Sequence, residues 1–222
     1  EPAVDSACAP SQEMPGWLFH SADPSAELWV AHVARTVPEL EKPEREAEML
    51  LAALQHLPAN PPVAGDVSST YGWRLDPLDP AGQRQQFHRG IDFVVPTGTP
   101  VVSPAPGIVR SVQRGGSYGR YLKIRHDSGF ETVLAHLSQV MVQPGEFVKR
   151  GQVVAGRGGG REDDGRTTGP HLHFEVRRSH SRSVPGQTVD PALIYSLYRD
   201  VWETVQAFPR ARIHAVGLQE NQ

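Results

Sequence analysis

The stretch "RTTGPHLHFEVRRS" (residues 166–179) holds the clearest strand pattern of the chain. A β-strand sends alternate side chains to opposite faces. His171 and His173 therefore share one face, and the other face carries only apolar residues, which are predicted to enter a core: Leu172, Phe174 and Val176. Two imidazoles on one face are able to form a site, but histidine is also an ordinary surface residue. The strand alone leaves both interpretations open.

Short β-rich runs precede this strand from Val63 onward. Turn signals rich in glycine and proline separate them, as at residues 96–98, 127–129 and 144–145. The chain contains 21 glycines and 20 prolines among 222 residues, which favours short strands over a helical bundle. We therefore predict a mainly β fold built from antiparallel sheets.

Both ends of the chain have a helical pattern instead. Apolar residues recur at helical spacing after residues 23–24 and again in "PEREAEMLLAALQHLP" (43–58), and "PANPP" (58–62) follows as a predicted stiff linker. An Asp-Pro pair at 190–191 begins a third amphipathic stretch, which predicts a C-terminal helix. The predicted division is a helical N-terminal region with its linker at 1–62, a β-domain at 63–195, and a C-terminal helix and tail at 196–222.

The composition excludes several classes of protein. The formal net charge is −3 and the pI is about 6.4, so no basic surface for nucleic acid is indicated. No apolar run approaches the ~18 residues of a membrane span. Cys8 is the only cysteine, so neither an internal disulfide nor a multi-cysteine zinc site is available. Any bound metal must therefore be held mainly by His, Asp or Glu.

A second informative stretch is "FHRGIDFVV" (residues 87–95), in which His88 and Asp92 stand four residues apart. On a helix this spacing would place both side chains on one face. Gly90 and the β-branched residues after it argue against a helix, so we expect His88 in a loop and Asp92 at the start of a strand. Taken alone, this pair is a weak indication of a metal site.

Four motifs together are more specific than any one of them: "SSTYGWR" (68–74), "FHRGIDF" (87–93), "HDSGFETVLAHLS" (126–138) and "GRTTGPHLHFEV" (165–176). In order and content they resemble the LytM/lysostaphin-type zinc metallopeptidases, which cut the peptide part of bacterial peptidoglycan. The resemblance spans roughly residues 63–195. It implies a two-sheet antiparallel β-domain with an open groove and a zinc ion, Zn²⁺, at one end.

The resemblance assigns roles to motif residues by position. His88, Asp92 and His173 correspond to the zinc ligands, and His136 and His171 correspond to two unligated catalytic histidines beside the metal. Catalytic zinc commonly uses three protein ligands and keeps a fourth position for water, whose pKa it lowers to ~7. Amide hydrolysis also needs a base for that water and an acid for the leaving amine. The sequence does not tell which of the two histidines is which.

Other motif residues have weaker claims. His126, at the end of a predicted strand, is expected to be structural, whereas Tyr71 fits either a donor to the oxyanion or a packing role. Two features depart from the family pattern. Leu134 stands where the family often has tyrosine, and the loop before the last motif is longer, with extra acidic residues at 162–164. Neither departure removes a ligand, so both bear on substrate contacts.

The form "SSTYGWRLDP…FHRGIDF" resembles the branch that cuts D-Ala–meso-diaminopimelate cross-links. That junction carries free carboxylates, which arginine grips through two hydrogen bonds. Candidates in or near the motif loops are Arg74, Arg89, Arg120 and Arg166. We therefore expect a D,D-endopeptidase. The alternatives are a glycyl-glycine endopeptidase and a non-catalytic LytM-like regulator of cell-wall amidases.

The expected partners are the peptide stems and cross-links of peptidoglycan. The expected location is the cell envelope, periplasmic or secreted, although no export leader is visible in the sequence. Residues 1–62 have no counterpart in the motifs, and packing on the β-domain, blocking its groove and docking elsewhere are all compatible with their pattern.

Overall fold

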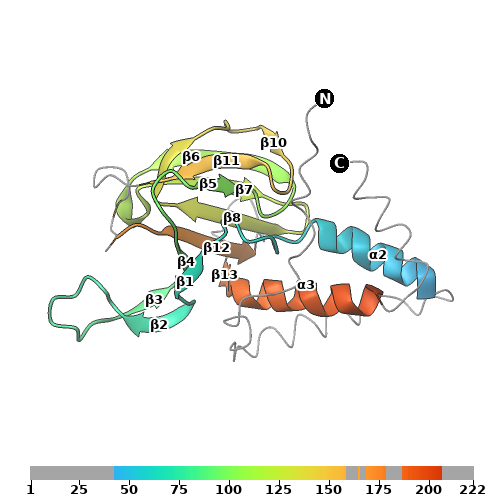
Figure 1. Ribbon diagram of the computed structural model, residues 1–222, viewed down its shortest axis with the longest axis horizontal. Helices are drawn as coiled ribbons and strands as arrows, with labels where there is room; N and C mark the ends of the chain where they lie inside the picture. Colours follow the sequence, from blue (N-terminus) through green and yellow to red (C-terminus); the bar gives the residue numbers. More distant parts are fainter. Residues whose placement is uncertain (1–42, 159–164, 166–168, 179–186, 207–222) are drawn as a thin grey trace. The chain divides into compact units, whose positions relative to one another are not determined.

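The computed structural model describes residues 43–158, 165, 169–178 and 187–206 (Figure 1). Two α-helices occur in this part of the chain, α2 (Pro43–Gln55) and α3 (Pro191–Gln206), which confirms the helices predicted at these positions. The helix predicted after residue 23 lies outside the described residues. None of the described helices is long and apolar enough to cross a membrane.

The described residues fall into two compact units, one of them His56–Pro191 and the other containing α2 and most of α3. The first unit is mainly β with antiparallel sheets, as predicted, while the three-part division at residues 62 and 195 stays a prediction. Its larger sheet has eight strands, seven in one path and β13 (Gln187–Val189) paired with β12 at its side. In path order the seven are β1 (Asp66–Ser69), β4 (Ile91–Val94), β12 (Leu172–Arg178), β8 (Phe130–Ala135), β7 (Arg120–Arg125), β6 (Gly107–Arg114) and β10 (Phe147–Val148).

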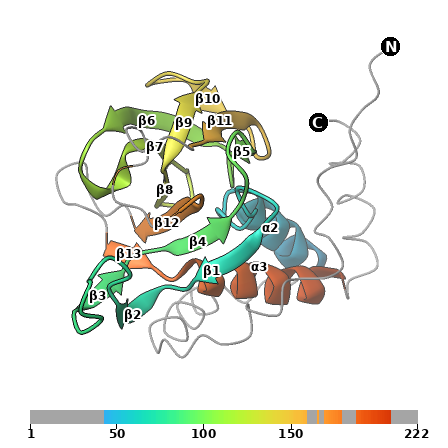
Figure 2. The same cartoon turned by 60° about the vertical axis from the view of Figure 1, so that its left-hand side comes forward.

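A smaller sheet faces the larger one across the core (Figure 2). It consists of three strands in the order β5 (Pro100–Val102), β11 (Val153–Arg157) and β9 (Leu137–Val140). Burial of apolar side chains from both sheets stabilises the unit by roughly 25 cal/mol per Å² removed from water. Fully buried members of this core are Val101, Leu122, Ile124, Leu134, Leu137, Val154, Leu172 and Phe174.

Strand β12 shows the predicted alternation. Leu172, Phe174 and Val176 are fully buried in the core. His173 and Glu175 leave the strand on the opposite face, and His173 lies opposite Asp92 of β4 in the strand register. The core face of one central strand therefore fixes the position of the residues on its polar face.

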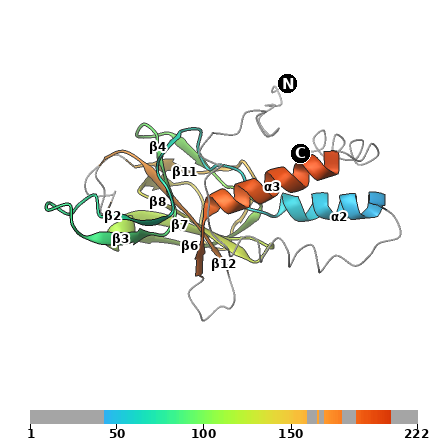
Figure 3. The ribbon, with the colours of Figure 1, turned by 90° about the horizontal axis from the view of Figure 1, so that it is seen from below.

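Two further strands, β2 (Gly72–Leu75) and β3 (Gln85–His88), pair only with each other and form an arm that extends from the sheets (Figures 1 and 3). Trp73 pairs with Phe87 on one face of the arm, and both rings are exposed, Trp73 by 72%. His88, which was expected in a loop, is instead the last residue of β3, because pairing with Gly72 continues the strand to this point. Asp92 lies near the start of β4, as predicted.

The proline-rich segment at 58–62, predicted as a stiff linker, is held against the β-unit. The backbone N–H of Val102 donates to the carbonyl of Pro62 (2.9 Å), and that of Asn60 donates to Pro104 (3.3 Å). Arg150 donates to the carbonyl of Leu57 (2.8 Å). Proline nitrogens cannot donate hydrogen bonds, so the segment contacts the β-unit mainly through its carbonyls. The segment therefore does not act as a free hinge.

Candidate metal centre and active site

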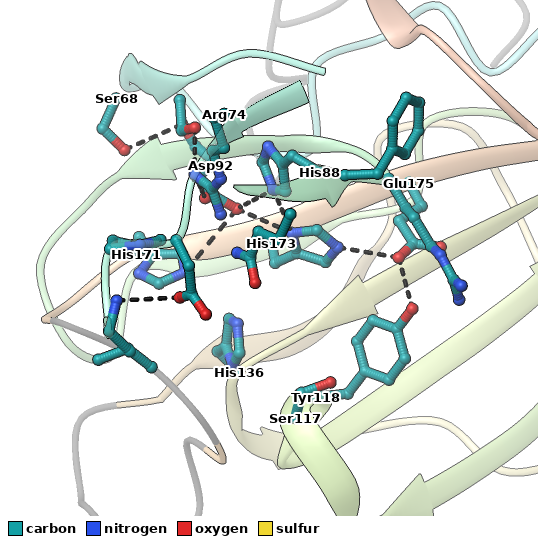
Figure 4. Close-up of a pocket in the computed structure, with 17 residues that line it drawn as sticks. Ser68, Arg74, His88, Asp92, Ser117, Tyr118, His136, His171, His173 and Glu175 are labelled. Carbon is teal, nitrogen blue, oxygen red and sulfur yellow. Dashed lines mark hydrogen bonds and ion pairs between the residues drawn. The ribbon is translucent and has the colours of Figure 1, made fainter. Parts of the chain in front are cut away.

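One pocket, of about 570 Å³, is lined by all five residues expected to be metal ligands or catalytic histidines. His88 comes from the end of β3, Asp92 from β4 and His173 from β12, while His136 and His171 lie at the ends of strands beside them. Figure 4 shows the side chains of His88, Asp92 and His173 pointing toward one another. Residues from distant parts of the sequence therefore meet in one place.

The donor atoms of His88, Asp92 and His173 form a tight triangle. The Nε2 atom of His88 lies 3.1 Å from Asp92 Oδ1 and 3.1 Å from His173 Nδ1, and His173 Nδ1 lies 2.8 Å from Asp92 Oδ1. All three side chains are buried, and the group has the composition and spacing to hold a metal ion. Two imidazole nitrogens and a carboxylate oxygen are a donor set that suits zinc.

Hydrogen bonds on the outer side of the two rings decide which nitrogens carry protons. His88 Nδ1 lies 2.7 Å from the carbonyl oxygen of Thr70, which only accepts, so Nδ1 must be the N–H. His173 Nε2 lies 3.0 Å from the carboxylate of Glu175, so Nε2 must be the N–H there. In neutral rings the inward nitrogens then carry lone pairs, and both face the oxygen of Asp92. Such a triangle is stable only with positive charge at its centre, which a metal ion supplies.

The pKa values of the cluster agree with this requirement. Burial disfavours a charged His173, but hydrogen bonds to Asp92 and Glu175 more than offset it and raise the pKa of His173 to about 9. Burial also raises the pKa of Asp92, but hydrogen bonds from His173 and His88 outweigh it and hold that pKa well below its ordinary value. A cation among the three donors would take the place of the proton that these carboxylates draw to His173.

The second oxygen of Asp92 also has an outer partner. Arg74, on strand β2 of the arm, donates to Asp92 Oδ2 at 3.3 Å and also to the hydroxyl of Ser69. In each of these three side chains, one polar atom points into the triangle and another is hydrogen-bonded to a residue outside it. Such outer contacts orient ligands and tune the affinity for the metal.

His136 reaches the pocket through an unusual backbone conformation. It stands between β8 in the large sheet and β9 in the small one, and its φ is 60°, the only positive φ of a non-glycine residue in the described part of the chain. Its N–H donates to the carbonyl of Tyr118 (3.0 Å), and its carbonyl accepts from Gly158 (2.7 Å). The left-handed conformation is unfavourable for most residues. Here it turns the imidazole into the pocket at the point where the chain changes sheets.

His171 presents one ring nitrogen to the metal cluster. Its Nδ1 lies 2.9 Å from the carbonyl of Gly169 and must donate to it, so Nε2 is the basic nitrogen. That Nε2 lies 3.8 Å from Asp92 Oδ1. Burial lowers the pKa of His171, which keeps the ring neutral at pH 7. The rings of His136 and His171 are 4.6 Å apart, so the two histidines face the cluster as a pair.

The other predicted roles divide three ways. His126 is structural, as expected, because it is buried and its two nitrogens contact the carbonyl of Pro106 and the hydroxyl of Thr132. The hydroxyl of Tyr71 donates to the carbonyl of Thr188 and does not line the pocket, which supports its packing role. Of the candidate arginines, Arg74 and Arg89 line the pocket and Arg120 does not, while Arg166 lies outside the described residues.

Sequence reasoning missed Glu175, Tyr118 and Arg177. Glu175 is fully buried, lines the pocket and contacts His173. Tyr118 comes from the short helix η2 (Gly116–Tyr118) and donates to Glu175. The alternation of β12 already placed Glu175 on the face of the two motif histidines, so that signal was available. Tyr118 is far from β12 in sequence, and no local pattern pointed to it.

Comparisons with known proteins agree with this geometry. Residues 86–191 match Peptidase family M23. The peptidoglycan DD-endopeptidase ShyC of Vibrio cholerae is 39% identical over 147 residues, which are 66% of this chain and 32% of ShyC. The chain spans between 24% and 32% of the length of such curated relatives.

Two solved structures are similar to this chain. A variant of the catalytic domain of the prophage-encoded M23 protein EnpA from Enterococcus faecalis is 31% identical, and the match covers 60% of this chain and 95% of that domain, with a TM-score of 0.49. Lysostaphin from Staphylococcus simulans is 25% identical, with a TM-score of 0.52 and coverage of 65% of this chain and 55% of lysostaphin. The likeness to lysostaphin confirms the LytM/lysostaphin-like fold expected from the motifs.

Proposed function

The chain belongs to peptidase family M23, and on that basis we propose that it is a zinc-dependent endopeptidase that hydrolyses peptide cross-links of bacterial peptidoglycan. The observation that carries the proposal is the triangle of inward donors from His88, Asp92 and His173, with a neutral imidazole beside it. Three ligands leave one coordination position open, which is typical of catalytic rather than structural zinc.

The zinc ion would lower the pKa of a bound water and polarise the carbonyl of the scissile amide. His88, Asp92 and His173 would hold it, the two histidines through Nε2 and Nδ1 respectively. The Irving–Williams order gives these donors appreciable affinity for other divalent metals as well. Zinc is proposed because the donor set suits it and because three ligands leave one coordination position open.

His171 has the properties of the general base. Its Nε2 faces the cluster, its Nδ1–H is fixed on Gly169, and its lowered pKa keeps Nε2 free of a proton at neutral pH. It would take the proton of the attacking water and pass it to the leaving amine. His136, 4.6 Å away ring to ring, would donate a hydrogen bond to the charge that develops on the substrate.

The proposed bond is D-Ala–meso-diaminopimelate, cut by D,D-endopeptidase action. The names of several relatives, among them ShyC, specify DD-endopeptidase activity on peptidoglycan. The carboxylates of this junction need a cation near the metal. Arg74 is engaged by Asp92 and Ser69, whereas Arg89 is exposed at the pocket and forms no ion pair within the described residues, so Arg89 is the proposed anchor.

Peptidoglycan lies outside the cytoplasmic membrane, so the proposed location is the periplasm or the cell exterior. The function is tested by incubating the purified, zinc-loaded chain with D-Ala–diaminopimelate cross-linked dimers and, separately, with pentaglycine. Monomers should form from the dimers, as measured by mass spectrometry. They should not form when a chelator has removed the metal beforehand. Cleavage of pentaglycine alone would indicate a glycyl-glycine endopeptidase. No cleavage of either, with activation of a cell-wall amidase, would indicate a regulator.

A further inference from the structure

Glu175 makes a set of contacts that no part of the proposed reaction uses. Its side chain is fully buried on β12, two residues from His173. One carboxylate oxygen, Oε1, accepts from His173 Nε2 (3.0 Å) and from the hydroxyl of Tyr118 (2.6 Å). The other, Oε2, accepts from Arg177 Nε (2.7 Å). A buried carboxylate is costly unless such partners satisfy it.

We propose that Glu175 is a positioning residue for the metal: it holds His173 with the proton on Nε2 and the lone pair of Nδ1 directed at the cation. Tyr118 and Arg177 hold Glu175 in place. Both oxygens of an ionised carboxylate only accept hydrogen bonds. Glu175 therefore pairs only with a His173 ring that carries a proton on Nε2. The proposal rests on the metal-ligand role of His173 in the proposed function.

Tyr118 ties this support to the second group of site residues. Its hydroxyl fixes Glu175, while its backbone carbonyl accepts the N–H of His136 at 3.0 Å. Arg177 also donates to the Tyr118 hydroxyl at 3.1 Å. A metal ligand and one of the unligated histidines therefore take their positions from the same residue of η2.

The first test is Glu175→Gln, with Glu131→Gln as its matched control. Glu131 is a buried carboxylate on the neighbouring strand β8, opposite Arg177 in the register, and is paired with Arg110 at 2.6 Å, but it does not contact His173. Both changes remove one buried negative charge that is paired with an arginine. We expect only Glu175→Gln to weaken zinc binding, by about 10–100-fold, the usual range for outer partners of metal ligands. The dissociation constant is measured by competition with a chelator.

The second test is a rescue. In Glu175→Gln the amide must place its oxygen toward Arg177 or toward His173, and the other neighbour then meets an N–H donor. Adding Arg177→Met removes that conflict and frees the amide oxygen for His173. The double variant should recover most of the zinc affinity that the single variant lost. If the Glu175–Arg177 ion pair only stabilised the fold, the double variant would lose both partners of the pair. It would then bind zinc no better than the single variant.

Tyr118→Phe removes one hydroxyl and leaves the backbone carbonyl in place. It should weaken zinc binding less than Glu175→Gln, and the visible absorption of cobalt-loaded protein should shift in both variants, since that spectrum reports ligand geometry. Wild-type affinity and spectrum in Glu175→Gln, or an equal loss in Glu131→Gln, would overturn the inference. Failure of the wild-type chain to bind zinc would instead overturn the proposed function, so the two failures are distinguishable.

Discussion

The metal cluster and the pair formed by His136 and His171 occupy one pocket but are held in different ways. In the cluster each ligand side chain has a second polar atom fixed from outside, by Thr70, Arg74 or Glu175. In the pair, positions are set by the backbone. His171 is bound to the carbonyl of Gly169, and His136 is placed by its left-handed φ.

The difference agrees with the roles that we propose for the two groups. A metal ligand must keep one tautomer and one direction, which a carboxylate or carbonyl on its outer atom enforces. A residue that exchanges protons must gain and lose charge, and a carboxylate partner would hold it in the charged form. Burial outweighs the nearby charge of Asp92, lowers the pKa of His171 and keeps it basic but neutral. The predictions below separate the two groups, beginning with the largest effect.

Asp92→Ala should abolish both zinc binding and hydrolysis. It removes one donor of the triangle, and with it the negative charge that offsets the charge of the metal. His88→Ala should do the same. Zinc per chain is measured by mass spectrometry of the metal, and Asp127→Ala, an exposed turn residue, is the control. Full zinc occupancy in Asp92→Ala would show that the cluster is not the metal site.

His171→Gln and His136→Asn should retain zinc but lower kcat by ~10²-fold or more, the scale of general acid–base groups. Asparagine is chosen at 136 because it tolerates positive φ, so backbone strain does not confuse the result. The combined loss in the double variant should be less than multiplicative if the two act as one unit. Loss of zinc in these variants would erase the distinction between cluster and pair.

His126 provides a third, purely structural kind of histidine. Burial lowers its pKa to about 4, against ~6.5 in the unfolded chain. The unfolded state therefore binds more protons between these values, and the free energy of unfolding should fall by about 3 kcal/mol as the pH drops from 6.5 to 4. His126→Asn should lack this part of the acid sensitivity. Urea unfolding of both proteins at pH 7, 5 and 4 measures the difference. An equal change in the free energy of unfolding with pH in the two proteins would contradict it.

Arg89→Gln should leave zinc binding intact and raise KM about 10-fold for cross-links with free carboxylates, because one charge-assisted hydrogen bond at an exposed position is lost. Substrates in which those carboxylates are amidated should show no difference between the two proteins. Arg120→Gln, outside the pocket, is the control. An equal effect of both variants would mean that only the general charge of the protein matters.

The sequence predicted the parts of the molecule that rest on local pattern. Alternation in β12, the turn signals and the amphipathic helices at both ends gave the fold class and the face on which His171 and His173 lie. The motifs led to the five residues that the structure brings into one pocket. These predictions depended on period and residue type, which are visible along the chain.

The remaining features depend on long-range pairing. Tyr118 reaches Glu175 across 57 positions, and nothing in its own neighbourhood indicates this contact. The left-handed turn at His136 arises from the change of sheet between β8 and β9, which only the assembled fold requires. The arm of β2 and β3 is built from strands of four residues each, too short for alternation to be read with any force.

The alternation of side chains in β12 also affects the register in which this strand pairs with its neighbours. Because side chains alternate with a period of two, a slip of one residue against β4 or β8 would exchange the faces of the whole strand. His173 and Glu175 would enter the apolar core, and Leu172, Phe174 and Val176 would lie on the face that carries the site. Burying an unpaired carboxylate costs several kcal/mol, so the slipped pairing is rejected most strongly by the residues of the site. The side chains of the proposed site therefore also disfavour an incorrect register in the sheet.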